Sequence, residues 1–563
     1  MNELFRRLRL KPGLAAEIGV ASLFANILAL ASPLFVIQVL NRYVAHGVDA
    51  TLVTLTTGVL LAIILEYAFR RVRMRLAKVV SAGPDSTIAT AGYNVLLKVK
   101  ASALERIPPG QRQQIVSATS SIEKAFGAGN IGAVFDVPFA LMFVVVLFLL
   151  SPALSGIVAC FLVVVFLIGT FNASRLQKET RQLLQESGHS NALIRSATAE
   201  IDTVRTFNAS SFLGKLWTEQ LEKVQGLRRS MESRQGGTQV IIQSATALMS
   251  VFVVSIGATL VVAGEIDVGA MIGANILAAR ALMPISRFSQ MGATFAEARE
   301  SLAILREFAK LPLEQDSGSF KTRYQGGLEF KDVAFVFPGN TTPLFESLSL
   351  VLMPGTILVI SGSNGAGKTT LTRLISGVID PVRGQILADG LDLRQASPEW
   401  WRKQIVYMPQ EPTLLNTTIR QNLMTVNPDV TEQQLAKAIN AAGLVSYLDE
   451  SPKGLETQIS ENGRSLSLGI RRRLALARAL TTDGMLVLFD EPTEGLDGEG
   501  VSCVYAAMKD LAKRGRTIIV VSHDPKIVKG AQVAIDLNNK PVPRITERPR
   551  PVDTSSNTEK LSS

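Results

Sequence analysis

Cysteine, histidine and charge are all scarce in this chain of 563 residues. The two cysteines, Cys160 in an apolar run and Cys503 in a more polar region, imply no disulfide framework. Charged residues make up 19% of the chain and hydrophobic residues 47%, which is apolar for a soluble enzyme. The formal net charge of +10 does not indicate nucleic acid as a partner, because Lys and Arg lie where a cytoplasmic membrane face would place them.

Apolar runs fill the first half of the chain, and a transmembrane helix needs about 20 such residues. Six spans are predicted, at 18–40, 51–69, 131–150, 154–171, 239–262 and 268–284. The last is short and contains Arg280, so a buried soluble helix is the alternative; its pairing with the fifth across 263–267 favours a span. The basic N-terminus precedes a run too long for a signal-peptide core, so a retained anchor is expected.

Basic residues are distributed unevenly between the predicted spans. The loops 70–125 and 173–238 carry ten Lys or Arg each, whereas the connections 41–50, 151–153 and 263–267 together carry only Arg42. The positive-inside rule therefore places the long loops and both termini in the cytoplasm. These loops also contain long amphipathic stretches, so the spans are expected to continue as helices beyond the membrane.

Charge is absent from the middle of every predicted span. Glu66, Asp136 and Arg280 fall towards the cytoplasmic ends, where interfacial ion pairs or snorkelling are the expected roles. The lack of a central charge argues against a proton- or ion-coupled carrier and leaves ATP as the energy source.

A phosphate-binding loop dominates the second half. An apolar strand, 356–361, runs into G-x-x-x-x-G-K-T and then into an apolar helix, the context that such a loop requires. The alternative is a chance glycine-rich turn. Lys368 is expected to reach the β- and γ-phosphates, and the Thr369 hydroxyl to hold Mg²⁺. The residues expected around the phosphates are Gly362, Ser363, Asn364, Gly365, Ala366, Gly367, Lys368, Thr369 and Thr370.

Two adjacent carboxylates follow a buried apolar strand, 485–489. Asp490 suits Mg²⁺ coordination, and Glu491 suits a general base or water-orienting group. Carboxylates at a strand end also form helix N-caps, but the apolar residues before this pair and Pro492 after it favour catalysis.

Three other side chains are candidates for the same site. The Gln410 amide is expected to touch Mg²⁺ or the attacking water. His523 ends another apolar strand, which favours a γ-phosphate contact over a structural role. Phe337 offers an aromatic face to an adenine ring.

Ser467 is expected to cap a helix that contains Arg471, Arg472 and Arg473. A capped helix N-terminus is an anion site. Since the chain already has one phosphate loop, this second feature makes sense if it completes the site of another copy.

The domain boundaries follow from composition. Residues 1–310 form the membrane domain, and the polar, glycine-bearing segment 311–327 is a linker. Residues 328–540 alternate strands and helices, as in an α/β nucleotide-binding fold. The tail 541–563, rich in Pro, Ser, Thr and charge, is expected to be disordered.

The order of these motifs resembles the nucleotide-binding domain of ATP-binding cassette (ABC) transporters, and six spans ahead of it resemble an exporter half-transporter. The segments 31–36 (ASPLFV) and 136–139 (DVPF) resemble the type I secretion system permease/ATPase family, and 191–205 its second cytoplasmic loop. The resemblance covers about residues 14–535. It implies a helical six-span membrane domain of type I ABC exporter fold, fused to an α/β P-loop domain.

Function and partners follow from the same resemblance. It implies ATP and Mg²⁺ as cofactors and protein export driven by ATP hydrolysis at the bacterial inner membrane. The implied partners are a second copy or a related half-transporter, a periplasmic adaptor, an outer-membrane channel and membrane lipid. Ser467 and Gly469 would meet the γ-phosphate held by the opposing copy. A lipid, glycan or drug exporter is the alternative, and an ATP-gated regulator or channel is a third reading that Glu491 and His523 disfavour.

The chain also departs from the family pattern. Many secretion ATPases carry an additional N-terminal peptidase-like domain, for which the residues before 18 leave no room. The usual signature Leu-Ser-Gly-Gly-Gln has Leu468 in place of the first glycine and Ile470 in place of the glutamine. Weakened contacts to the partner's nucleotide are expected, which opens the possibility of an asymmetric heterodimer. Phe337 stands where the family often has tyrosine.

Overall fold

The computed structural model describes residues 2–44, 47 and 49–547. Contacts divide the chain into two compact units. The helical unit comprises Met1–Val99 and Ala103–Pro312, and the α/β unit comprises Lys100–Ser102 and Leu313–Ser563. Each is described by itself below.

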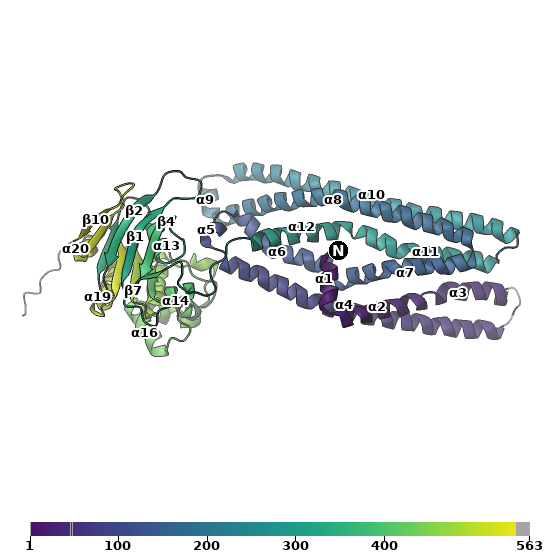
Figure 1. Ribbon diagram of the computed structural model, residues 1–563, viewed down its shortest axis with the longest axis horizontal. Coiled ribbons are helices and arrows are strands. Elements are labelled where there is room, and N and C mark those ends of the chain that lie inside the picture. Colours follow the sequence, from purple (N-terminus) through teal and green to yellow (C-terminus); the bar gives the residue numbers. More distant parts are fainter. Residues whose placement is uncertain (1, 45–46, 48, 548–563) are drawn as a thin grey trace, which may run out of the picture. The chain divides into compact units, whose positions relative to one another are not determined.

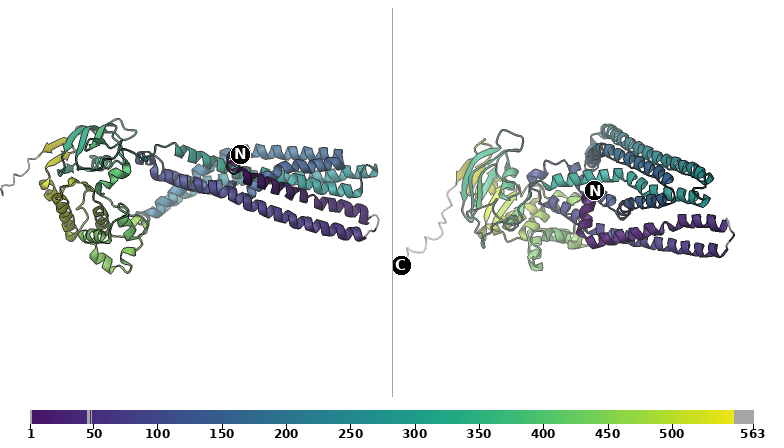
Figure 2. Two further views of the ribbon diagram at one scale, coloured as in Figure 1. Left: turned by 60° about the horizontal axis from the view of Figure 1, so that its bottom comes forward. Right: turned by 45° about the vertical axis from the view of Figure 1, so that its right-hand side comes forward.

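Long helices make up the first part of the chain (Figures 1 and 2). They are α1 (Asn2–Leu10), α2 (Pro12–Leu28), α3 (Ala31–Gln38), the π-helical turn η1 (Val39–Val44), α4 (Asp49–Lys98), α5 (Ala101–Leu104), α6 (Pro109–Ala125), α7 (Ala128–Leu150), α8 (Pro152–Ala199), α9 (Ile201–Thr206), α10 (Ser210–Val262), α11 (Val268–Gln290) and α12 (Gly292–Ala309).

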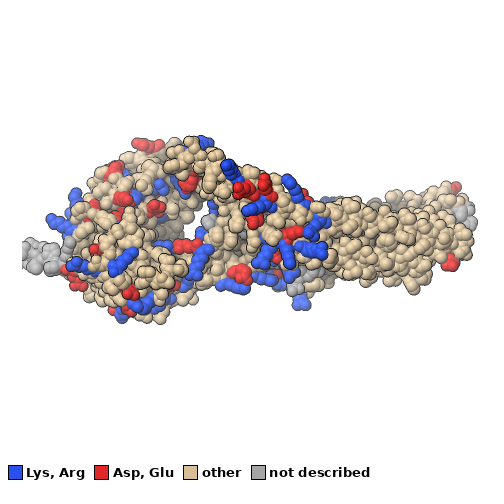
Figure 3. Space-filling view, turned by 90° about the horizontal axis from the view of Figure 1, so that it is seen from above, with Lys and Arg blue, Asp and Glu red and all other residues tan. Residues whose placement is uncertain are grey.

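Within the described part of the chain, six helical segments are long and apolar enough to cross a membrane, and each contains one predicted span. They are Pro12–Val44, Asp49–Lys98, Ala128–Leu150, Pro152–Ala199, Ser210–Val262 and Val268–Ala309. A helix of 50 residues, the length of α4, is about 75 Å long, against about 30 Å of hydrocarbon. The expected continuation of the spans as helices is therefore confirmed. The part of this unit that is almost free of charged side chains is visible in Figure 3.

Small residues let these helices approach closely. Helix α10 packs along α8, and α11 packs on α7 and α8. A Cβ on Gly169 of α8 would collide with the side chain of Ser289 on α11, and one on Gly273 would collide with Ile37. Without a hydrophobic driving force between helices in lipid, such close packing is a main source of their association.

Several charges within the helical unit are paired, including the buried ones described here. The Asp136 carboxylate lies 2.5 Å from a terminal nitrogen of Arg73 and accepts a hydrogen bond of 3.0 Å from the Asn26 amide, all three buried. Glu66 lies 2.8 Å from Arg70 and 3.9 Å from Arg280. The ion pairs expected for Glu66, Asp136 and Arg280 are therefore present.

The α/β unit contains two sheets. Its strands are β1 (Leu328–Phe335), β2 (Phe345–Leu352), β3 (Ile357–Ser361), β4 (Arg383–Ala388), β5 (Leu391–Asp392), β6 (Ile405–Met408), β7 (Leu486–Asp490), β8 (Thr517–Val521), β9 (Val533–Asp536) and β10 (Arg544–Glu547). The smaller sheet has the antiparallel order β2-β1-β4-β5. The larger has the order β10-β9-β3-β8-β7-β6, parallel from β9 to β6.

Helices connect and cover these strands (Figure 1). They are α13 (Lys368–Ile375), α14 (Pro398–Lys403), α15 (Ile419–Met424), α16 (Glu432–Ala441), α17 (Val445–Glu450), the 3₁₀ turns η2 (Gly454–Glu456) and η3 (Glu461–Gly463), α18 (Leu468–Leu480), α19 (Gly498–Lys513) and α20 (Pro525–Gly530). One apolar cluster includes Phe330 and Ile360, and another includes Phe489 and Leu474.

The α/β unit extends further in both directions than composition suggested. Residues 313–327 of the expected linker belong to it, and Tyr324 is buried with its ring centroid 5.3 Å from that of Trp401 in a T-shaped arrangement. At the other end, β10 pairs with β9, so 544–547 are not the disordered tail expected there. The proline-rich composition of this segment indicates disorder, but pairing with β9 holds residues 544–547 as a strand. The rest of the expected tail, 548–563, lies outside the described residues.

Removing one charge from the buried Arg73–Asp136 pair tests how much this pair stabilises the folded protein. Asp136→Ala leaves the Arg73 guanidinium buried without a counter-charge, which typically costs about 3–5 kcal/mol. We expect a large fall in the unfolding temperature of the purified protein in detergent, measured by differential scanning fluorimetry. As a control, Arg70→Ala breaks the more exposed Glu66 pair and should cost about 1 kcal/mol or less. Equal shifts for the two variants would contradict this account.

Candidate functional site

The phosphate-binding loop leads from β3 into α13, as its motif predicts. Gly365 and Gly367 have φ of 80° and 109°, in the left-handed region that favours glycine. A Cβ on Gly367 would also press against Leu344. Lys368 is the first residue of α13, and its ammonium donates a 2.7 Å hydrogen bond to the carbonyl oxygen of Gly362. The loop therefore leads directly into the N-terminus of a helix, where anions bind.

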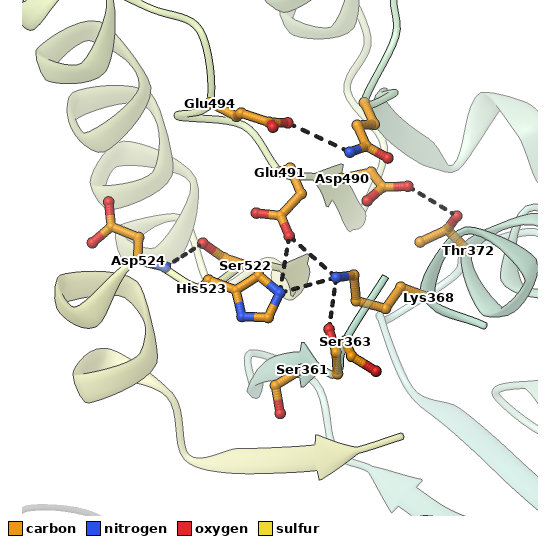
Figure 4. Close-up of polar contacts among 12 residues, drawn as sticks. Ser361, Ser363, Lys368, Thr372, Asp490, Glu491, Glu494, Ser522, His523 and Asp524 are labelled. Carbon is orange, nitrogen blue, oxygen red and sulfur yellow. Dashed lines mark hydrogen bonds and ion pairs between the residues drawn. The ribbon is translucent and has the colours of Figure 1, made fainter. Parts of the chain in front are cut away.

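Three strands bring their carboxyl ends together beside this loop, because β3, β8 and β7 are neighbours in the parallel sheet. The Lys368 ammonium lies 2.9 Å from His523 Nε2 and 3.7 Å from Glu491 Oε1. His523 Nε2 lies 3.6 Å from the same Glu491 oxygen. All three side chains point towards one another in Figure 4. Parallel α/β sheets bind ligands at this edge.

Asp490 is the last residue of β7 and is almost completely buried. One carboxylate oxygen accepts a 3.5 Å hydrogen bond from the Thr372 hydroxyl, and the other, Oδ1, has no hydrogen-bond partner among the described residues. Burial, together with the neighbouring charge of Glu491, raises the pKa of the Asp490 carboxyl to about 6. A buried oxygen without a partner, beside the hydroxyl of Thr369, fits a hard cation such as Mg²⁺.

Arg472 holds the surroundings of the two carboxylates in place. Its guanidinium, which is 3% exposed, donates to the backbone carbonyls of Glu491 (3.2 Å) and Gln410 (3.1 Å). It also lies 3.3 Å from the carboxylate of Glu494, which accepts a 3.4 Å hydrogen bond from the Gln410 amide. No sequence motif predicts the roles of Arg472 and Thr372. Arg472 and Arg473 are both buried, and the run of three arginines does not indicate which of them contacts the carboxylates.

Glu491 has a strained backbone, with φ of 45°. A residue other than glycine pays for this left-handed conformation and keeps it only where neighbours impose it. Here the Glu491 N–H donates to Val521 of β8 at 2.9 Å, and Arg472 holds its carbonyl. The strain turns the carboxylate towards Lys368 and His523 (Figure 4).

The remaining expected site residues lie elsewhere in the α/β unit. Phe337 follows β1, and the centroid of its exposed ring lies 5.2 Å from that of Phe335 in a T-shaped arrangement. Ser467 caps α18 by accepting a hydrogen bond of 3.3 Å from the Ile470 N–H. A Cβ on Gly469 would meet open space. Among the described residues, no hydrogen bond or ion pair links Ser467 or Gly469 to Lys368, Glu491 or His523.

Comparison with known proteins identifies the family. A family described as the ABC transporter transmembrane region matches residues 16–285, and one described as ABC transporter matches residues 345–494. The alpha-hemolysin translocation ATP-binding protein HlyB of Escherichia coli O157:H7 is 28% identical over 93% of this chain and 74% of its own length. The chain is an ABC exporter half-transporter. Its fold is similar to that of a bacterial Atm1-family ABC exporter with ATP bound, with a TM-score of 0.83 at 19% identity over 96% of this chain and 95% of that one.

Two further relatives are also toxin translocation ATP-binding proteins. The exotoxin translocation ATP-binding protein PaxB of Pasteurella aerogenes is 26% identical over 92% of this chain and 72% of its own length. The leukotoxin translocation ATP-binding protein LktB of Mannheimia glucosida is 27% identical over 92% and 73%. The half-transporter is thus a multi-pass membrane protein whose ABC domain binds and hydrolyses ATP. A half-transporter implies dimerisation.

The raised pKa of Asp490 predicts a stability effect of defined sign. Because this pKa lies above the ordinary 3.8, the free energy of unfolding of the nucleotide-free protein falls as the pH rises from 3.8 to about 6. The full penalty is present above about pH 6 and is absent below 3.8. A rise from 3.8 to about 6 corresponds to roughly 3 kcal/mol.

Asp490→Asn removes this penalty. We therefore expect the nucleotide-free variant to unfold at a higher temperature than the wild type at pH 7.5, with the difference shrinking towards pH 4. Mg²⁺ with ADP should stabilise the wild type more than the variant. Thermal unfolding across this pH range measures both effects, and a variant less stable than the wild type at pH 7.5 would contradict the assignment.

Proposed function

We propose that this half-transporter is the ATPase and permease of a type I protein secretion system in the bacterial inner membrane. The observation that carries the proposal is the similarity to toxin translocation proteins, which extends over 92–93% of the chain and so includes the membrane half. The segments ASPLFV at 31–36 and DVPF at 136–139 lie in that half. A periplasmic adaptor and an outer-membrane channel are the partners that this function requires.

The proposed orientation places both termini and the long loops in the cytoplasm. Lys and Arg gather in the loops 70–125 and 173–238 rather than in the short connections. ATP made in the cytoplasm would then reach the α/β unit. In this arrangement the short connections face the periplasm.

The arrangement of side chains supports a distinct role for each residue in ATP binding and hydrolysis. Lys368 would exchange its bond to Gly362 for contacts with the β- and γ-phosphates. Glu491 would orient the attacking water and accept its proton, and His523 would contact the γ-phosphate. Phe337 would stack on the adenine ring. Thr369, Asp490 and Gln410 would hold Mg²⁺, which when bound neutralises charge on the phosphates.

A second copy would complete each ATP site. The capped N-terminus of α18, with Ser467 and the uncovered Gly469, offers N–H groups to an anion. Since no hydrogen bond or ion pair among the described residues joins these two to Lys368, Glu491 or His523, they are available to a partner's γ-phosphate. Binding of two ATP molecules would close the pair of ABC domains and drive the membrane halves from inward- to outward-facing, and hydrolysis would reset them.

Leu468 favours a related half-transporter as a second candidate partner. Its side chain is 39% exposed at the start of α18 and leans against Gly495. A leucine at this position places a large apolar side chain next to Ser467, the proposed contact of the partner's phosphate. A heterodimer in which only one composite site has a regular signature would tolerate this better than a homodimer.

ATP turnover by the purified protein in lipid nanodiscs tests the proposed function, with Glu491→Gln as the blank. We expect turnover at least ten-fold above the blank. We also expect a chemically unfolded polypeptide to stimulate turnover severalfold, whereas its folded form does not, because an extruded chain must be extended. Stimulation by lipids or small amphiphiles but by no polypeptide would contradict protein secretion. Copurification of a periplasmic adaptor is an independent check.

Restoring the usual signature tests the self-paired site. Leu468→Gly combined with Ile470→Gln should raise the turnover of the homodimer by about ten-fold, equivalent to about 1.4 kcal/mol of transition-state stabilisation. Val351→Ala, at an exposed position of β2, is the matched control and should change nothing. If the double variant turns over no faster, the altered signature does not limit hydrolysis, and the case for a heterodimer is lost.

A further inference from the structure

One face of α10 carries a stripe of uncharged polar side chains. We call Gln235, Gln239, Gln243, Thr246 and Ser250 the glutamine stripe. At 100° per residue, these positions fall within an arc of about 80° on the helix. All five are exposed or half-buried, and no charged residue occurs between Arg234 and Glu265. The stripe therefore runs from the charged end of the helix into its membrane-spanning part.

The rest of α10 shows why this stripe is unusual. Ile242, Ala245 and Met249 are buried in the helical unit. A second exposed face, roughly opposite the stripe, is apolar and includes Val240, Leu248, Val251 and Phe252. That face suits lipid. The helix thus presents two different surfaces outward, and only one of them is compatible with hydrocarbon.

The glutamine amides have no hydrogen-bond partner among the described residues. An amide without a partner in hydrocarbon costs about 4–8 kcal/mol, so Gln243, which lies inside the predicted span 239–262, cannot be held against lipid tails at a tolerable cost. Only water, another polypeptide or a transported chain satisfies its amide. Polar residues inside membrane segments commonly line a transport path.

Helix α11 extends the polar surface. The Ser250 hydroxyl donates a 2.8 Å hydrogen bond to Asn275 Oδ1. The two residues border a hollow of about 380 Å³ together with Gln243 and Thr246. A hollow of this size has room for a segment of chain. Close packing of helices, such as that at Gly169 and Gly273, leaves no such space.

We propose that the glutamine stripe binds the backbone of an extended, unfolded polypeptide during transport. This inference rests on the proposed function and names the chemistry of its substrate contact. Each glutamine or asparagine amide offers one acceptor and an N–H donor pair, which match the C=O and N–H of a peptide. Because the stripe is uncharged, it accepts cargo of either charge, as a path for varied sequences requires.

The spacing supports an extended partner. Successive stripe residues three or four apart rise by about 4.5–6 Å along the helix. Two residues of an extended chain span about 6.6 Å. The amides therefore meet roughly every second residue of an extended strand, whose backbone groups are free of internal hydrogen bonds. A folded helix would present its side chains instead, since its backbone groups are already paired.

Photo-crosslinking tests the proposal. Benzoylphenylalanine replaces Gln243, or Leu248 on the apolar face as a matched control, in the full-length protein in nanodiscs. The probe is a fluorescent 30-residue peptide of Gly, Ser, Ala and Asn. We expect labelling at position 243 at least ten-fold above that at 248. A peptide with N-methylated backbone nitrogens should label at least ten-fold less, because it lacks the N–H donors.

Two other crosslinking results would overturn the proposal. A product joining two copies of this chain through position 243 means that the stripe is an interface. A lipid adduct at that position means that the face meets the bilayer. Without the crosslinker, Gln239→Leu with Gln243→Leu should raise the peptide concentration for half-maximal stimulation of turnover about ten-fold, whereas Gln239→Asn with Gln243→Asn should largely retain it.

The outcomes also separate this inference from the proposed function. If unfolded polypeptide stimulates ATP turnover but the peptide does not label position 243, the stripe assignment alone fails. If ATP is hydrolysed but no polypeptide stimulates turnover or labels either position, the protein secretion function fails, and this inference fails with it.

Discussion

Parallel pairing of β3, β8 and β7 is the constraint on which the ATP site depends. Three segments, the first of which lies more than a hundred residues before the other two, deliver Lys368, Glu491 and His523 to one edge of one sheet. Each strand is wholly or largely buried, so its register is imposed by hydrogen bonds on both sides and by the apolar cores above and below. A slip of one residue would turn Asp490 away from Thr372 and reverse every core contact of β7.

The same site destabilises the nucleotide-free folded protein. Asp490 and Glu491 place two carboxylates side by side, one of them buried and raised in pKa, and Glu491 holds a left-handed backbone. Arg472 offsets part of this cost by binding the backbone on both sides of the cluster. Such a site is stabilised by what it binds, which is how nucleotide binding becomes coupled to conformation in a transporter.

The helical unit follows a different rule, because hydrocarbon offers no hydrogen bonds. Its buried charges are paired, as Asp136 is with Arg73, and its helices meet through small residues. The glutamine stripe departs from this rule, since its amides are neither paired within the described chain nor replaced by apolar groups. That departure is what supports the role in transport that we propose for it.

Much of this half-transporter was readable from sequence because its signals are local. Span length, charge bias and the phosphate loop each depend on a few consecutive residues, and they predicted six spans and an α/β P-loop domain. The N-cap role of Ser467 is equally local, and the structure has it. Composition was less reliable at the domain edges, where Tyr324 and β10 are ordered by contacts with distant residues.

Tertiary structure alone decided the strand order and the partners of each side chain. Sequence proposed Gln410, Asp490, Glu491 and His523 as site residues, but only the sheet brings them to one edge. It did not show that Arg472 and Arg473 are both buried, nor that only Arg472 binds the backbone beside Glu491, because the partners of a helix residue depend on what packs there. The glutamine stripe is likewise visible as spacing in the sequence. Its exposure, opposite a lipid-compatible face, emerged only when α10 packed against α8 and α11, since packing determines which polar groups remain without partners.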